Sequence, residues 1–242
     1  MAGRALTLSM ESFSGAELGK EFDLDFALEW GLLPFVRNEP EDAADILAAY
    51  VNTYLKEELQ AEGLIRNVPP FVRFLSVAGQ INGQALNVQN IAREAAVARS
   101  TVDTYFAVLS DTLLRNPSDR LWQGAALETL IYHELRVYNE VGRRHRPVFY
   151  YRTPAGVEID FIIETAPKRP KSPPVVTAIE VKRSERWDRA WGKPMLDLAA
   201  AAGVKVDRMI GVYCGTRSYR FGAIQVFPVK DFVRALFAGE VF

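Results

Sequence analysis

The sequence is poor in cysteine and in long hydrophobic runs. Cys214 is the one cysteine among 242 residues, so no disulfide can form within the chain, as is usual in a reducing cytoplasm. No apolar run approaches the roughly 18 residues that a membrane-spanning helix needs. The N-terminal stretch also lacks the apolar core of a signal peptide. We therefore expect a cytoplasmic protein with no membrane partner.

The chain also lacks an excess of charge and a phosphate-binding loop. Its formal net charge is -1, so binding to nucleic acid would need a local basic patch. No Gly-x-x-x-x-Gly-Lys-Ser/Thr stretch occurs, and ATP is therefore not an expected cofactor. Hydrophobic residues make up 49% and charged residues 24% of the chain, which is the composition of an ordinary globular protein.

Two halves of different character are predicted. Residues 1–115 read as helical, with helices at 41–62, 70–79, 88–96 and 100–113. The polar break RNPSDR at 115–120 suits a loop and marks the boundary. Residues 121–242 alternate helices and strands, and the order αβββαββα predicts an α/β fold with a mixed sheet. The expected elements of this half are helices at 122–141, 188–202 and 229–238 and strands at 147–153, 157–165, 175–183, 208–214 and 222–227.

The stretch 86–114 has the pattern of a helix-turn-helix, with Ser100 placed to cap the second helix. In a DNA-binding protein with this motif, the first turns of the second helix would face a groove of the DNA. The residues expected to do so are Arg99, Ser100, Thr101 and Thr104. A plain corner of a helical bundle would show the same pattern, and that alternative stays open.

Acidic residues lie inside two strands that are otherwise apolar. Alternation along VEIDFII puts Asp160 on the face opposite Ile159 and Phe161. Glu180 and Lys182 share a face of the strand that contains AIEVK. A carboxylate in an apolar strand is costly without a cation partner, and oxygen ligands of this kind suit Mg²⁺ or Mn²⁺. A structural ion pair between Lys182 and either acid is the competing interpretation.

This constellation resembles the PD-(D/E)xK nuclease superfamily, whose fold is that of restriction endonucleases. The resemblance implies that Asp160 and Glu180 bind the metal and that the carbonyl of Val181 adds a ligand. It also implies that Lys182 prepares the attacking water. An acid on the preceding helix often completes such sites, and Glu128 in ALETLIYHEL matches it.

The chain is also similar to the C-terminal region of a large family of prokaryotic AAA-type ATP-binding proteins. The similarity rests on FDLDFALEWGLLPFV, NVQNIAREAAVARSTVDTYFAVLSDTLL, ALETLIYHEL, YYRTPAGVEIDFII and AIEVKRS, which run in order from about residue 20. In that family an ATPase domain precedes a helix-turn-helix, here expected to be winged-helix-like, and a nuclease-like domain of unknown function. Here the ATPase part is absent, and the segment before the Glu128 helix is shorter than usual.

A basic cluster, GRRHRP, follows that helix, and Arg143, Arg144 and Arg146 could hold phosphates beside the acids. A solvated loop is the simpler interpretation. The sequence thus favours a metal-dependent phosphodiesterase acting on DNA, and its rival is a non-catalytic module that binds DNA or a protein partner such as an ATPase.

Overall fold

A computed structural model describes residues 12–50, 65, 67–80, 87–112, 123–170, 172–201 and 203–242. Contacts divide the chain into two units. One consists mainly of Ser14–Leu24 with Leu130–Phe242, and the other mainly of Asp25–Thr129. The division falls inside a helix, whereas the predicted boundary at 115–120 lies outside the described residues.

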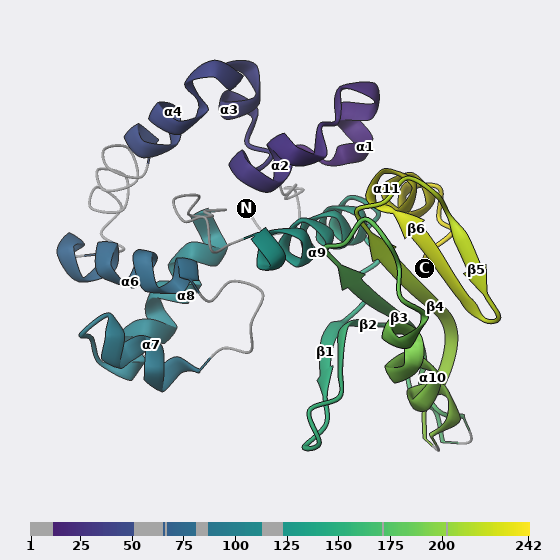
Figure 1. Ribbon diagram of the computed structural model, residues 1–242. Helices are drawn as coiled ribbons and strands as arrows, with labels where there is room; N and C mark the ends of the chain where they lie inside the picture. Colours follow the sequence, from purple (N-terminus) through teal and green to yellow (C-terminus); the bar gives the residue numbers. More distant parts are fainter. Residues whose placement is uncertain are drawn as a thin grey trace, which may run out of the picture. The chain divides into compact units, whose positions relative to one another are not determined.

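The first unit, here called the sheet unit, contains a six-stranded mixed sheet of order β1-β2-β3-β4-β6-β5 (Figure 1). Strands β1, β2 and β3 pair antiparallel, β3, β4 and β6 pair parallel, and β5 returns antiparallel to β6. Their bounds are β1 Val148–Arg152, β2 Glu158–Ala166, β3 Val175–Lys182, β4 Lys205–Tyr213, β5 Tyr219–Phe221 and β6 Ile224–Pro228. The α/β class and the mixed sheet expected from the sequence are confirmed.

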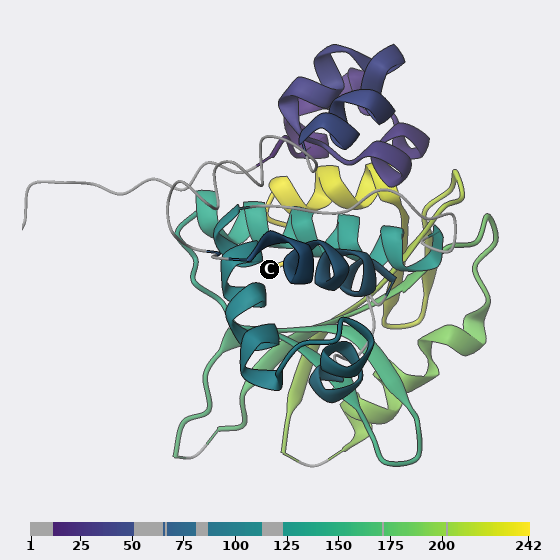
Figure 2. The ribbon, with the colours of Figure 1, turned by 90° about the vertical axis from the view of Figure 1, so that its left-hand side faces the viewer.

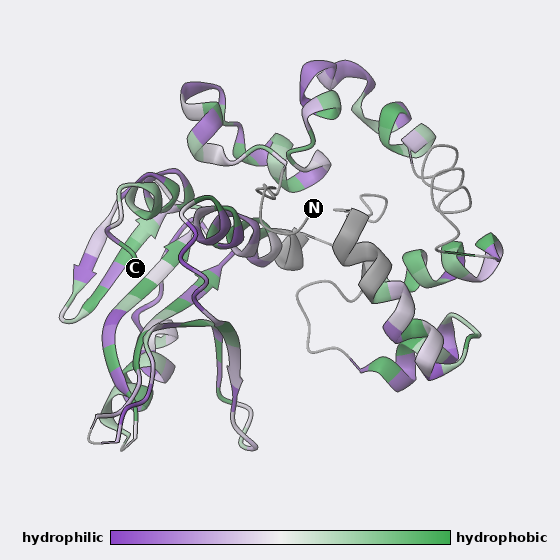
Figure 3. Ribbon diagram, turned by 180° about the vertical axis from the view of Figure 1, so that it is seen from behind, coloured by the Kyte–Doolittle hydropathy of each residue, from purple (hydrophilic) through white to green (hydrophobic). Residues whose placement is uncertain are grey.

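Strand β3 is central and is almost wholly buried, which explains its rich content of β-branched residues. On one face its Val176 and Ala178 pack with Met195 of α10 (Lys193–Ala200). On the other face the Thr177 hydroxyl donates a hydrogen bond of 3.3 Å to the Val241 carbonyl. Figure 3 shows green hydrophobic and purple hydrophilic segments along the strands of the sheet.

Two helices run side by side in the sheet unit (Figure 2). They are α9 (Gln123–Val141), from Leu130 onward, and α11 (Val229–Phe237). The rings of Tyr138 and Phe237 join them edge to face, with centroids 5.5 Å apart.

The N-terminal segment Ser14–Leu24 belongs to the sheet unit although it is far from it in sequence. Its helix α1 (Gly15–Leu18) begins with a capping box formed by Ser14 and Glu17 and is followed by the 3-10 turn η1 (Gly19–Glu21). The Gly15 N–H donates a buried hydrogen bond of 2.7 Å to Oε1 of Glu134 on α9.

The second unit is helical. Its main core joins Phe71 and Phe74 of one helix to Ile91, Val102 and Tyr105 of the next two. The described elements are α2 Leu24–Trp30, α3 Pro34–Asn38, η2 Pro40–Asp42, α4 Ala43–Ala49, α6 Val68–Gln80, α7 Val88–Glu94 and α8 Arg99–Thr112. The predicted helix at 41–62 is seen from Ala43, and residues 51–64 lie outside the described part.

Three local predictions need correction. The helix expected over 188–202 is a 3-10 turn, η5 (Arg189–Gly192), followed by α10, because Asp188 caps the turn and Pro194 suits only a helix start. Strand β4 begins at Lys205 rather than at 208. The short strand β5 was not expected at all.

In the ranges that the structure describes, every helix is too short or too polar to cross a membrane.

Candidate functional site

The predicted acids meet where β2 and β3 stop pairing. The register between these strands ends with Phe161 opposite Ile179. One residue further, an Oδ2 of Asp160 accepts the backbone N–H of Val181 at 2.7 Å. The Val181 N–H thus donates to a side chain instead of to a backbone carbonyl of β2. This hydrogen bond fixes the Asp160 carboxylate against β3.

Lys182 joins both carboxylates. Its Nζ lies 2.5 Å from Oε1 of Glu180 and 3.8 Å from Oδ2 of Asp160. The same ammonium donates to the Val181 carbonyl at 3.1 Å. The side chains of Asp160 and Glu180 are 11% and 7% exposed, whereas that of Lys182 is 30% exposed. Two nearly buried acids therefore share one cation that reaches solvent, and we call these three residues the acid–lysine cluster.

One carboxylate oxygen of the acid–lysine cluster is buried without a hydrogen-bond donor among the described residues. Oε2 of Glu180 is buried and accepts no hydrogen bond from any residue that the structure describes. A buried carboxylate oxygen in this state carries a desolvation cost of about 1–3 kcal/mol or more. Because a hard cation would remove that cost, the oxygen is a fitting ligand position for Mg²⁺ or Mn²⁺.

Burial raises the pKa of both acids, and nearby negative charge adds to the effect. Burial, followed by the charge of Asp160, raises the pKa of Glu180 to about 7, against the opposing effect of Lys182. Burial also raises the pKa of Asp160, although Lys182 and the Val181 N–H act in the other direction. The cluster therefore holds more negative charge than one lysine can neutralise, which is the electrostatic condition for taking up a further cation.

Glu128 lies on α9 and is half-buried, and it belongs to the helical unit, which ends at Thr129. No group of three or more His, Cys, Asp or Glu side chains suited to a metal ion occurs within the described ranges. The protein ligands that the fold does bring together are the carboxylates of Asp160 and Glu180 and the Val181 carbonyl. That set fits Mg²⁺, which commonly keeps several waters and binds through one or two carboxylates. The role of Glu128 stays a prediction.

A glycine and a tryptophan that the sequence reading did not assign to the site lie next to it. Gly211 of β4 is the register partner of Glu180. A Cβ built on Gly211 would lie 2.5 Å from the Trp187 indole, so only glycine lets the ring cover the strand there. A glycine inside a buried strand is the sequence signal that could have revealed this close approach.

The hairpin of β1 and β2 carries a second set of interacting polar side chains. Arg152 Nε and Glu158 Oε1 form an ion pair of 3.0 Å at the exposed end. Burial and the hydrogen bond to Glu158 raise the pKa of Tyr150 to about 12, so its hydroxyl remains a donor. On the other side of β2, Phe161 stacks on Tyr132 with centroids 6.1 Å apart.

The residues predicted to read DNA lie around the turn between α7 and α8. Arg99, Ser100 and Thr104 are exposed and Thr101 is half-buried. The helix starts at Arg99, so Ser100 lies inside it rather than at its cap, and its carbonyl accepts the Thr104 hydroxyl at 3.0 Å. The turn itself contains Ala96 with φ 54. Two helices and a tight turn are present, and contact with DNA stays a prediction.

Much of the basic cluster after α9 has structural contacts. Arg144 donates to the Tyr138 carbonyl at 2.7 Å and lies over the Tyr138 ring at 3.6 Å. Arg146 exchanges backbone hydrogen bonds with the Asn139 side chain and faces the Phe242 ring. Arg143 is exposed, with φ 47. Two of the three arginines therefore have a structural role, and phosphate binding by the cluster stays a prediction.

Two family matches meet near the start of α9, the helix inside which the two structural units also divide. Residues 123–232 match a family described as a domain of unknown function (DUF4143). Residues 21–120 match another domain of unknown function (DUF8612). No curated protein and no solved structure matches the chain. Both matches are to uncharacterised domains, and the first spans the acid–lysine cluster.

Proposed function

We propose that the sheet unit is a PD-(D/E)xK-type phosphodiesterase that depends on a divalent metal and acts on DNA. One observation carries the proposal: two strands bring Asp160, Glu180 and Lys182 together, and a buried oxygen of Glu180 accepts no hydrogen bond from the residues that the structure describes. An apolar sheet keeps such a costly group only where something else compensates for it.

Each residue has a defined task in this scheme. Asp160 and Glu180 would hold Mg²⁺ or Mn²⁺, with the Val181 carbonyl as a further ligand. When bound, the metal supplies stabilisation of negative charge and a more acidic water. Lys182, already within reach of both acids and partly exposed, would orient the attacking water by donating a hydrogen bond to it, which favours loss of that water's proton to solvent. The resemblance also makes Glu128 a supporting acid, and that role stays a prediction.

A second candidate is a non-catalytic module that binds DNA or regulates a partner such as an AAA-type ATPase. The observation in its favour is that Lys182 already pairs with Glu180 at 2.5 Å, as a purely structural ion pair would. The helix-turn-helix arrangement of α7 and α8 suits the same alternative.

Titration with Mn²⁺ by calorimetry separates the two candidates. The wild type should bind the ion, and Asp160→Asn should lose binding because the variant removes one charged ligand. Asp207→Asn, which removes an exposed acid at the start of β4, is the matched control and should bind like the wild type. Absence of binding by the wild type would count against the phosphodiesterase.

A further inference from the structure

Two loops leave the sheet at the same edge as the acid–lysine cluster. Strands β3 and β4 are parallel, so their carboxyl ends meet at one edge, where ligands of open α/β sheets commonly bind. The loops are residues 183–192 after β3 and 214–218 after β4, and we call them the arginine loops. The Cys214 N–H donates to the Ser184 carbonyl at 3.0 Å, which holds the two loops side by side.

The arginine loops carry exposed arginines that form no ion pair with any acid in the described part of the chain. Arg183, Arg186, Arg189 and Arg217 are all exposed, and in the described ranges none is within ion-pair distance of a carboxylate. The acids of the same loops are Glu185 and Asp188, and Asp188 accepts the Ala190 N–H at 2.8 Å. By contrast, Arg152, Arg208 and Arg234 elsewhere in the sheet unit each pair with an acid.

The backbone beneath these arginines is fixed. The Tyr213 hydroxyl donates to the Arg217 carbonyl at 2.6 Å and accepts the Arg217 N–H at 3.2 Å. The Ser184 hydroxyl does the same for Arg186, at 2.8 and 3.2 Å. Because the backbone is already ordered, binding of a ligand by these loops would cost little backbone entropy, which favours a binding surface.

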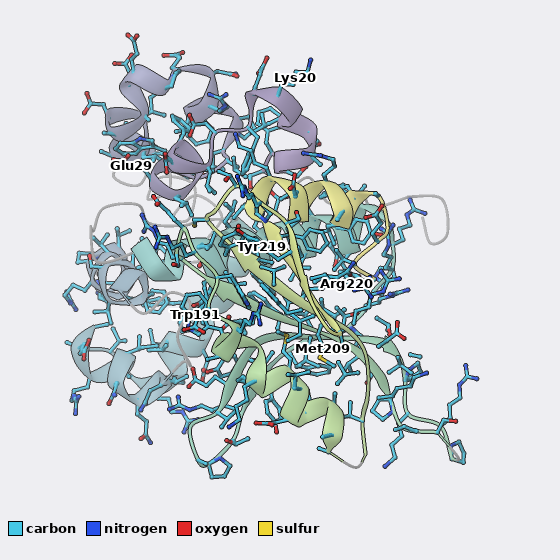
Figure 4. All side chains as sticks on the ribbon, turned by 45° about the vertical axis from the view of Figure 1, so that its right-hand side comes forward. Lys20, Glu29, Trp191, Met209, Tyr219 and Arg220 are labelled. Carbon is cyan, nitrogen blue, oxygen red and sulfur yellow. The ribbon has the colours of Figure 1, made fainter. Side chains whose placement is uncertain are left out.

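Aromatic rings adjoin the charged side chains. The Arg189 guanidinium lies 4.6 Å from the centroid of Phe221, on which Tyr219 stacks at 5.7 Å. Tyr219 is 42% exposed. Figure 4 labels Tyr219 together with Trp191, whose ring meets that of Trp187 edge to face at 5.4 Å. Arginines interleaved with aromatic rings are the composition of surfaces that bind nucleic acids.

We infer that the arginine loops bind the phosphate backbone of a polynucleotide beside the acid–lysine cluster. The inference rests on the proposed function for its choice of ligand. Arg183 directly follows Lys182, so a backbone held by the loops would pass the two carboxylates. The formal net charge of the whole chain is -1. A local group of arginines can still attract phosphate groups, so binding here does not require a basic protein.

The test is binding of a fluorescein-labelled duplex DNA, and of a labelled single strand, in EDTA over a series of salt concentrations. The variant is the triple change Arg183→Ala, Arg186→Ala and Arg217→Ala in the full chain. Its control is the triple change Lys205→Ala, Arg208→Ala and Arg234→Ala, which removes the same charge away from the loops. Circular dichroism and thermal unfolding check that both variants fold.

The arginine-loop variant should bind at least one probe at least tenfold more weakly than the control variant. Its slope of log affinity against log salt should fall by about 0.9 for each lost phosphate contact. Asp207→Asn should bind like the wild type, because Asp207 lies near the start of β4, at the opposite end of that strand from the arginine loops. If this pattern holds but no variant or wild type cleaves DNA, the proposed function fails and the binding surface stands. A slope equal to that of the control, or no binding of either probe by the wild type, would overturn the inference.

Discussion

The Asp160 carboxylate accepts the backbone N–H of Val181, so a side chain of β2 occupies the place of a strand hydrogen bond of β3. This contact sets the direction of Asp160 and leaves the Val181 carbonyl facing the Lys182 ammonium. A small departure from regular pairing thus gathers the oxygens of two strands at one point, next to the cation that neutralises part of their charge.

The pH dependence of stability follows from Glu180. Its pKa rises from 4.5 to about 7 on folding, chiefly through burial. The folded protein therefore binds more protons than the unfolded chain between these values, and the free energy of unfolding should fall as pH rises through this window. Glu180→Gln should flatten the fall in urea titrations made at several pH values, and an unchanged slope would show that the shift is absent.

Metal binding should have the opposite pH dependence. A protonated Glu180 is a poor ligand, so the affinity for Mn²⁺ should rise from about pH 6 to about pH 8. Calorimetry at both values measures the change. A constant affinity would mean that the ion binds without displacing a proton from the cluster.

Lys182→Met separates catalysis from metal binding. The methionine keeps most of the length of the side chain but removes the charged donor that would orient the attacking water, so cleavage should fall by about 10²–10³-fold. Loss of the ammonium also removes its repulsion of a bound metal ion. At about pH 8, binding of Mn²⁺ should therefore persist. Lys193→Met, which changes an exposed lysine of α10, is the control and should leave both properties unchanged.

Gly211→Ala should lower the free energy of unfolding by about 1–3 kcal/mol, because its Cβ would overlap the Trp187 ring. Trp187→Ala removes the ring that the methyl group meets. The double variant should therefore be more stable than the sum of the single effects predicts, which a cycle of urea titrations measures. Strict additivity would exclude the proposed overlap.

The N-terminal segment should contribute to the stability of the sheet unit through Glu134. Glu134→Leu removes the acceptor of the buried Gly15 N–H and should cost about 1–3 kcal/mol in the free energy of unfolding. Glu134→Gln keeps an oxygen in place and should cost less. Equal costs would show that the hydrogen bond is not the source of the effect.

Periodicity predicted most described elements of the sheet unit and of the helix pair α7 and α8, because each has a clear apolar pattern of its own. Strand β5 was missed because its three residues, Tyr219–Phe221, are too few to show alternation. The sequence pattern predicts an α-helix over the 3-10 turn Arg189–Gly192, because the two kinds of helix have similar spacing of apolar residues over so short a stretch.

The convergence of Asp160, Glu180 and Lys182 could be predicted, since alternation puts each acid on a known face of its strand. The register that sets Asp160 against Val181 could not, because it depends on where two distant strands begin to pair. The packing of Ser14–Leu24 in the sheet unit could not be predicted either. It depends on a tertiary hydrogen bond from the Gly15 N–H to Glu134, which no local sequence pattern encodes.

Cleavage of supercoiled DNA tests the central claim most directly. The wild type in the presence of Mg²⁺ or Mn²⁺ should nick or linearise the plasmid. EDTA and Asp160→Asn should each abolish this, Lys182→Met should slow it by the factor given above, and Asp207→Asn should leave it unchanged. Cleavage that persists in Asp160→Asn, or no cleavage of supercoiled, linear or single-stranded DNA by the metal-bound wild type, would contradict the account and leave the acid–lysine cluster as a structural ion pair.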